Sequence, residues 1–218
     1  FAIEFSTEPI IYFRIPAYRA NTWTIELKKQ LDVNRKVTID GWDTGTDPIR
    51  LADDFIQPVI FLEPSATSDG VGVVFNKGGG GGVLRGLQFT GFDTAVEVKA
   101  DDVQLLGNVI FGDGMTGVGI QVTEGTRAQI GNLPYEVSVG GQAYRFNPRN
   151  VLGGLDRAIV VGTETAAAQN PKAFTNFIVN NQIGVYDFET YSNRLGIEVV
   201  DSPNNFIIDN IIGESTVA

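Results

Sequence analysis

Short apolar runs, each followed by Gly or Asn, recur along most of the chain. One such phrase begins at Leu84 and the next at Leu106, 22 positions apart (106 minus 84), and later phrases begin at Ile130, Ile178 and Ile208. Periods of roughly 20 to 30 residues built from short strands are typical of solenoids, in which each turn buries its apolar face only against its neighbours. The pattern predicts a repetitive β architecture.

Between these phrases lie more short apolar segments, bounded by Gly, Asn, Asp or Pro. Short, evenly spaced strands suit either a β-sandwich or a parallel β-helix. A sandwich needs hairpins with Asn-Gly or Asp-Gly turns. Here, instead, phrases such as Gly196–Val200 recur in the same orientation once per repeat. The spacing therefore favours an all-β fold of stacked parallel strands.

The beginning of the chain departs from the repeat, with strand-like segments punctuated by Pro9 and Pro16. We expect residues 1–36 to form an N-terminal β cap, because a solenoid must cover the apolar face that no preceding turn covers. The parallel β-helix is then expected over 37–218. Two irregular stretches, 133–156 and 163–175, are expected to loop out of it, as insertions in solenoids do.

The strands also predict which side chains point inward and which form the corners. Asn tolerates the left-handed backbone conformation and can hydrogen-bond its counterpart in the next turn. We expect a structural role at the corners for Asn108, Asn132, Asn150, Asn181 and Asn210. The side chains expected to point inward in stacked rows are Val96, Val98, Leu105, Ile120, Val122, Ile130, Val160, Ile178, Ile197, Val199 and Ile207.

The order of three phrases carries a resemblance to a known group of proteins. Val37–Gly41 is followed by Arg149–Gly153, and then by Asn181–Asp187 leading to Gly196–Val199. Over residues 37–215 this order resembles right-handed parallel β-helix proteins of the pectate-lyase-like superfamily, in particular a bacterial extracellular β-helix repeat family. The resemblance implies a right-handed β-helix and an extracellular or cell-envelope location. The superfamily includes polysaccharide lyases, hydrolases, tailspikes and adhesins, so function does not follow from the fold.

The composition restricts the partners and the catalytic groups that this protein can use. Lys plus Arg is 16 and Asp plus Glu is 26, for a formal net charge of −10, which argues against nucleic acid or an anionic membrane surface as partner. No apolar stretch approaches the roughly 20 residues of a membrane span, so we expect no membrane insertion. The absence of His and Cys removes the usual general base, zinc ligands and thiolate nucleophile. Any catalysis would use carboxylates, Lys, Arg or Tyr.

Two groups of residues are candidates for catalysis. The pair Asp101 and Asp102 invites comparison with the paired carboxylates of glycoside hydrolases, in which one group protonates the leaving oxygen and the other activates water. Its alternative role is a polar corner before the next strand. Arg145 and Arg149 lie around the irregular stretch and would supply the cationic group of a lyase, or pair with nearby acids on the surface.

A cluster of carboxylates is the candidate metal site. Asp40, Asp43 and Asp47 concentrate oxygen ligands within one loop, and Ca²⁺ takes six to eight such oxygens. The spacing is not that of an EF-hand. The two interpretations are a calcium site and a solvated acidic turn, and we favour the turn, with no cofactor.

The sequence favours a non-catalytic structural or interaction module of an extracellular or cell-envelope assembly. The alternative is a carbohydrate-active enzyme, a polysaccharide lyase or glycoside hydrolase, acting on an acidic polysaccharide. The expected partners are other protein chains or further repeats of a longer parent protein, because Ile211–Gly213 stands where the pattern would begin another turn. A polysaccharide is the other candidate partner.

Overall fold

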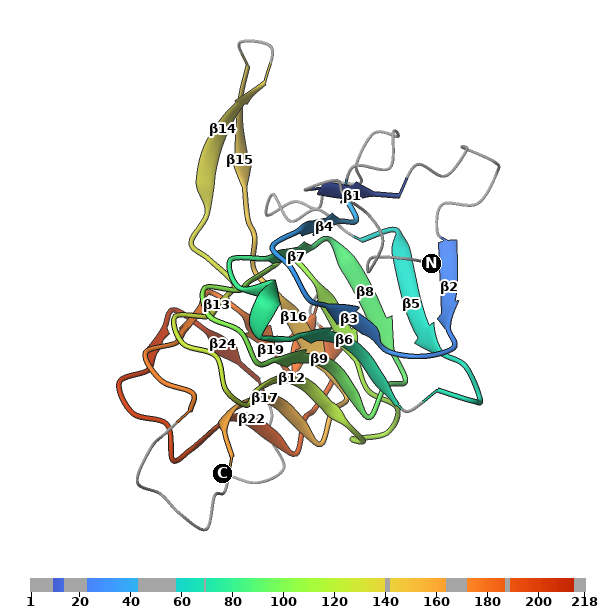
Figure 1. Ribbon diagram of the computed structural model, residues 1–218. Helices are drawn as coiled ribbons and strands as arrows, with labels where there is room; N and C mark the ends of the chain where they lie inside the picture. The colour runs from blue at the N-terminus through green and yellow to red at the C-terminus, as the bar shows by residue number, and fades with distance from the viewer. Residues whose placement is uncertain are drawn as a thin grey trace.

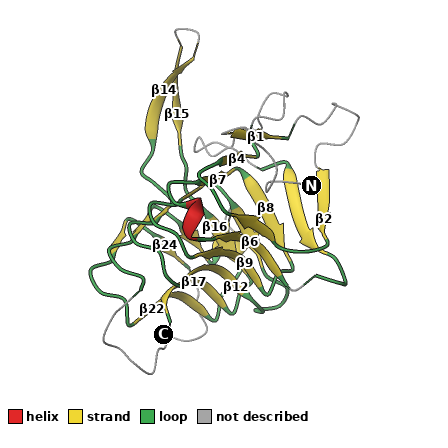
Figure 2. Cartoon of the chain, in the orientation of Figure 1, coloured by secondary structure: helices red, strands yellow, loops and turns green. Residues whose placement is uncertain are grey.

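The computed structural model is built from three parallel β-sheets that surround one apolar core (Figure 1). It describes residues 10–13, 23–42, 58–68, 70–139, 142–163, 172–186 and 189–213. Apart from one short 3₁₀ helix at Lys77–Gly79, these residues form strands, turns and loops (Figure 2). The predicted all-β fold and parallel β-helix are thereby confirmed. Within these ranges no helix has the length and apolar character needed to cross a membrane.

Each sheet collects one strand from successive turns. Sheet A contains, in spatial order, β1 (Ile10–Tyr12), β4 (Thr38–Asp40), β7 (Val83–Arg85), β10 (Gln104–Leu106), β13 (Gln129–Ile130), β18 (Phe177–Val179) and β23 (Phe206–Ile208). Sheet B contains β2 (Trp23–Leu27), β5 (Ile60–Pro64), β8 (Leu87–Thr90), β11 (Val109–Phe111), β16 (Val151–Gly153), β19 (Gln182–Ile183) and β24 (Ile211–Ile212). Sheet C contains β3 (Leu31–Val33), β6 (Val71–Phe75), β9 (Thr94–Val98), β12 (Val118–Val122), β17 (Arg157–Gly162) and β22 (Leu195–Val200).

The chain visits the sheets in the order A, B, C, so that three strands make one turn and the last described turn consists of β23 and β24. Two antiparallel hairpins interrupt this order. One pairs β14 (Tyr135–Val139) with β15 (Gln142–Phe146) and projects from the stack (Figure 1); the other pairs β20 (Val185–Tyr186) with β21 (Glu189–Thr190). The stretch expected to be irregular over 133–156 is therefore a hairpin followed by a return to sheet B. Of 163–175, residues 164–171 lie outside the described ranges.

The described strands before residue 37 belong to the same sheets as the rest. β1 pairs in parallel with β4, β2 with β5, and β3 with β6. These strands therefore form the first turn of the helix, although the sequence placed the start of regular stacking at Val37. A cap beyond this turn stays a prediction, because residues 1–9 and 14–22 lie outside the described ranges.

Strand register shows which side chains stack inside. The pairs of sheet C place Ile120 between Val96 and Ile159, and all three are at most 1% exposed. In sheet A, Leu105, Ile130 and Ile178 form a second fully buried row. Val96, Val98, Leu105, Ile120, Val122, Ile130 and Ile178 are buried as expected.

Three of the side chains predicted to point inward differ from that prediction in row or in burial. Val160 is buried, but its register partners are Gln121 and Glu198, so Ile159 and not Val160 continues the row of Ile120. Val199 and Ile207 occupy the expected rows yet are 44% and 49% exposed. Their exposure has a simple physical cause, since no described turn follows to cover them. Ile197, which is partly buried, packs against the core.

Truncating one buried and one half-exposed isoleucine of the apolar rows tests the assigned stacking. We expect Ile120→Ala to lower the free energy of unfolding by about 2 to 5 kcal/mol, because it removes buried methyl groups and leaves a cavity. Ile207→Ala is the matched control, since the same truncation at a half-exposed position should cost less than about 1 kcal/mol. Urea denaturation measures both changes. Equal losses would contradict the assigned stacking.

Candidate functional site

A ladder of four asparagines runs along the corner between sheets A and B. The side-chain amide of Asn108 donates to Oδ1 of Asn150 at 3.1 Å, that of Asn150 to Asn181 at 3.0 Å, and that of Asn181 to Asn210 at 2.9 Å. Each of these Oδ1 atoms also accepts the backbone N–H of the preceding Asn. The expected structural role of these asparagines is confirmed, because their polar atoms connect one turn to the next.

Asn132 does not belong to this ladder. Its Oδ1 accepts the N–H of Leu133, and its carbonyl oxygen accepts the side-chain amide of Asn180. The hairpin explains the difference: it is inserted immediately after Asn132, so the fifth turn reaches the ladder position only at Asn150. A count of residues within the phrase could not reveal this shift.

The proposed carboxylate pair is engaged in contacts between turns. Oδ1 of Asp101 accepts the N–H and the hydroxyl of Thr126 at 2.9 and 2.7 Å. Asp102 forms a two-point ion pair with Arg127, at 2.7 and 2.8 Å. Hydrogen bonding from Arg127 lowers the pKa of the Asp102 carboxyl despite the opposing effect of partial burial, and the attraction of the two charges lowers it further. A lowered pKa favours the ionised form and so disfavours Asp102 as a proton donor.

The two candidate arginines belong to a later turn, in and directly after the projecting hairpin. Arg145 belongs to β15, and strand pairing places it opposite Glu136 of β14. Arg149 follows the hairpin and precedes the ladder residue Asn150. Asp101 and Asp102, by contrast, lie between sheets C and A and bond to Thr126 and Arg127. The partners of the two carboxylates are thus residues of the next turn other than the candidate arginines.

An aromatic cluster at the base of the projecting hairpin was not predicted. The rings of Trp42 and Phe146 meet edge to face at 4.7 Å, and Tyr135 contacts Phe146 at 5.3 Å. The guanidinium of Arg85 lies 5.4 Å from the Trp42 ring centre. Burial raises the pKa of the Tyr135 hydroxyl, and the charge of Arg85 partly opposes that shift. The cluster joins the hairpin to the side of the helix.

Two glycines make room for Trp42. A Cβ atom on Gly86 would lie 2.4 Å from the indole, and one on Gly107 only 2.2 Å from it. Both residues also have positive φ, at 67° and 62°, a conformation that favours glycine. Gly86 and Gly107 each directly follow a strand of sheet A in successive turns. This repeated glycine is the feature of the sequence that could have indicated the cluster. Side chains there would force the indole to shift.

Asp40 is the only described member of the candidate calcium loop. Its Oδ1 accepts the N–H of Trp42 at 3.0 Å, and its Oδ2 pairs with Arg85. The Asp40 side chain is 4% exposed. Asp43 and Asp47 lie outside the described residues, and among those that are described no group of three or more His, Cys, Asp or Glu side chains is placed to hold a metal ion. Arg85 therefore neutralises one of the three carboxylates of the candidate calcium site.

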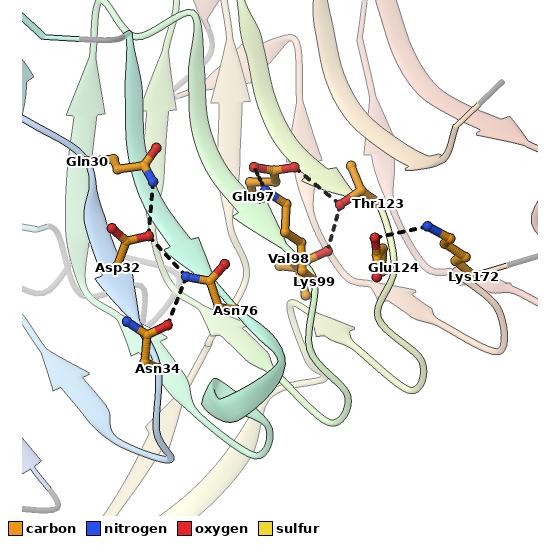
Figure 3. Close-up of polar contacts among 10 residues, drawn as sticks. All are labelled: Gln30, Asp32, Asn34, Asn76, Glu97, Val98, Lys99, Thr123, Glu124 and Lys172. Carbon is orange, nitrogen blue, oxygen red and sulfur yellow. Dashed lines mark hydrogen bonds and ion pairs between the residues drawn. The ribbon is translucent and has the colours of Figure 1, made fainter. Parts of the chain in front are cut away.

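Polar side chains near the end of sheet C also bond from turn to turn (Figure 3). Asn76 donates to both Asp32 and Asn34 at 3.0 Å. Farther along, Glu97 pairs with Lys99 of its own turn at 2.7 Å and accepts the hydroxyl of Thr123 in the next turn at 3.3 Å, while Lys172 pairs with Glu124 at 3.2 Å. The polar groups in this close-up thus bind one another, and those of Asn76, Thr123 and Lys172 link successive turns.

The asparagine ladder can be tested by removing one member. Asn150→Ala should lower the free energy of unfolding by about 3 kcal/mol, because the buried N–H and amide groups of Asn108 lose their common acceptor. Asn132→Ala is the control outside the ladder and should change stability by no more than about 0.5 kcal/mol. Thermal and urea unfolding provide the measurement. Similar effects of the two substitutions would refute the ladder's contribution.

The pKa of Asp102 should depend on Arg127. In Arg127→Ala the carboxyl pKa of Asp102 should rise toward its ordinary value, because the hydrogen bonds and the positive charge are lost. A pKa that is lowered in the folded state adds stability above the unfolded-state pKa, and this is lost as pH falls through the folded-state pKa. Both side chains are about half exposed, so the effect on stability is small.

Carboxyl chemical shifts followed against pH by NMR measure this change. Asp156, whose pKa is lowered chiefly by its hydrogen bonds from Arg194, serves as the internal control. Its titration should be unaffected by Arg127→Ala and should move upward in Arg194→Ala. An unchanged Asp102 titration in Arg127→Ala would show that this ion pair does not form in solution.

Comparison with known proteins adds no family assignment: no family model, no curated protein and no solved structure matches the chain. The resemblance to pectate-lyase-like proteins therefore rests on the sequence phrases together with the parallel sheets, which are compatible with it.

Proposed function

We propose that this protein is a non-catalytic structural or interaction module of an extracellular or cell-envelope assembly. The observation that carries the proposal is the exposure of apolar side chains on β23 and β24, where Ile207 and Ile212 are each 49% exposed and would be covered by another protein chain or by further repeats of a longer parent protein. Large exposed apolar surfaces mark sites of protein association. The proposed location rests on the resemblance to extracellular β-helix proteins.

The arrangement of charged groups supports the same proposal. Asp101 and Asp102 are bound to neighbouring side chains of the next turn, and Asp40 is bound to Arg85. A glycoside hydrolase requires one carboxylic acid poised to donate a proton and a second carboxylate facing it across the substrate. Asp102, with its lowered pKa, is poorly suited to the first of these roles.

The competing activity is degradation of an acidic polysaccharide. We expect the protein to release neither unsaturated ends, followed by ultraviolet absorbance, nor reducing sugar from a panel of uronate polymers. Asp101→Asn, Asp102→Asn and Arg149→Gln would be assayed beside the wild-type chain. Turnover by the wild-type chain that disappears in any of these variants, with folding retained, would overturn the proposal and establish the enzyme.

A further inference from the structure

Three Asp-Gly pairs occur in the sequence, and they place a side-chain carboxyl next to a backbone nitrogen that no following Cβ shields. The pairs are Asp40–Gly41, Asp69–Gly70 and Asp113–Gly114. In such a pair the Gly nitrogen can attack the carboxyl carbon of Asp and close a succinimide ring. Asp69 lies outside the described residues, and the structure separates the other two pairs sharply.

The pair Asp40–Gly41 is held inside the stack. The Asp40 carboxylate accepts the N–H of Trp42 and pairs with Arg85, and its side chain is 4% exposed. The N–H of Gly41 donates to the carbonyl oxygen of Arg85 at 2.8 Å. Both reacting groups are therefore engaged, so ring closure at Asp40 requires local opening of the stack.

The pair Asp113–Gly114 lies in the loop 112–117, which connects β11 to β12 at the corner between sheets B and C. Residues 113–116 are all exposed. Within the described part of the chain, no hydrogen bond or ion pair engages the Asp113 carboxyl or the Gly114 N–H. A Cβ on Gly114 would meet nothing within 4 Å, so the surroundings leave room for the nitrogen to approach the carboxyl.

The loop is anchored to the next turn on either side of this pair. The N–H of Gly112 donates to the carbonyl oxygen of Gly153 at 2.9 Å, and the N–H of Met115 donates to that of Gly154 at 2.8 Å. The length of backbone between these two anchors matches their spacing on the next turn. An additional backbone atom between them would displace one anchor.

We propose that Asp113 is a site of spontaneous isomerisation to isoaspartate, and that the product loosens the corner between sheets B and C. The Gly114 nitrogen forms a bond to Cγ of the acid form of Asp113, while its proton and the carboxyl hydroxyl leave together as water. Water then adds to the main-chain carbonyl carbon of Asp113, and the bond from that carbon to the Gly114 nitrogen breaks. The chain now runs through Cβ and Cγ, which adds one backbone atom between the anchors. The reaction requires only water.

A time course on the folded chain tests the site. The full chain is held in warm, near-neutral buffer, and samples are digested with trypsin, which releases residues 37–50 and 100–127 as separate peptides. Fragmentation in the mass spectrometer that distinguishes aspartate from isoaspartate locates the product. Isoaspartate should form at least about tenfold faster at Asp113 than at Asp40, because reaction at Asp40 waits for local opening.

The same time course in urea separates structure from sequence. In the unfolded chain both pairs are free, so Asp40 and Asp113 should isomerise at similar rates. If both react in urea but Asp113 reacts no faster than Asp40 in the folded chain, the inference is overturned.

Amide hydrogen exchange tests the loosening. After ageing, the Met115 N–H should exchange faster in the isomerised fraction than in fresh protein, because its bond to Gly154 is strained by the longer backbone. Asp113→Glu is the matched control, since it keeps the carboxyl but would have to close a larger and slower-forming ring. Exchange in this aged variant should stay as in its fresh form. Unchanged exchange at Met115 in isomerised wild-type chain would refute the loosening.

Discussion

Parallel backbone pairing between successive turns places each residue against its equivalent in the next turn. Ile120 is held between Val96 and Ile159 by the register of β9, β12 and β17. Since a strand shifted by one residue would point its side chains to the opposite face, the buried rows and the pairing reinforce one another. The positions of the corner residues follow from the same constraint.

Side chains at the corners supply hydrogen-bond partners that the strands cannot. Where the chain bends from sheet A to sheet B, buried backbone groups need partners outside the β ladders. The side chains of Asn108, Asn150 and Asn181 supply these partners, and each is at most 1% exposed. A buried amide would be costly if it were only partly bonded, but here each one bonds to the turns on both sides. Because these amides are hydrogen-bonded on both sides, their burial is compensated, and each one links its turn specifically to the next.

Insertions enter this framework without breaking it. The hairpin β14–β15 is inserted between β13 and β16, yet β16 resumes pairing with β11 in register. The hairpin is joined to the helix through Phe146, which packs on Trp42, and Trp42 in turn rests against Gly86 and Gly107. The contacts that hold the hairpin therefore come from three earlier parts of the chain. Such a cluster depends on stacking, because its members are distant in sequence.

The sequence by itself determined the all-β class, the parallel stacking and most of the buried positions, because short strands of one repeat length have few other ways to bury their apolar faces. It also identified all four ladder asparagines, together with Asn132, which lies outside the ladder. Tertiary structure decided what depends on alignment between turns: that Asn150 and not Asn132 continues the ladder, and that Ile159 rather than Val160 continues the row of Ile120.

Tertiary structure also decided which polar groups are already engaged. Asp101 and Asp102 form a pair in sequence, yet their partners Thr126 and Arg127 lie one turn further along. Asp40 belongs to an acidic loop by sequence but pairs with Arg85 across β4 and β7. A local pattern shows what chemistry a side chain can perform. Only the packing of one turn on another shows which atoms have their partners.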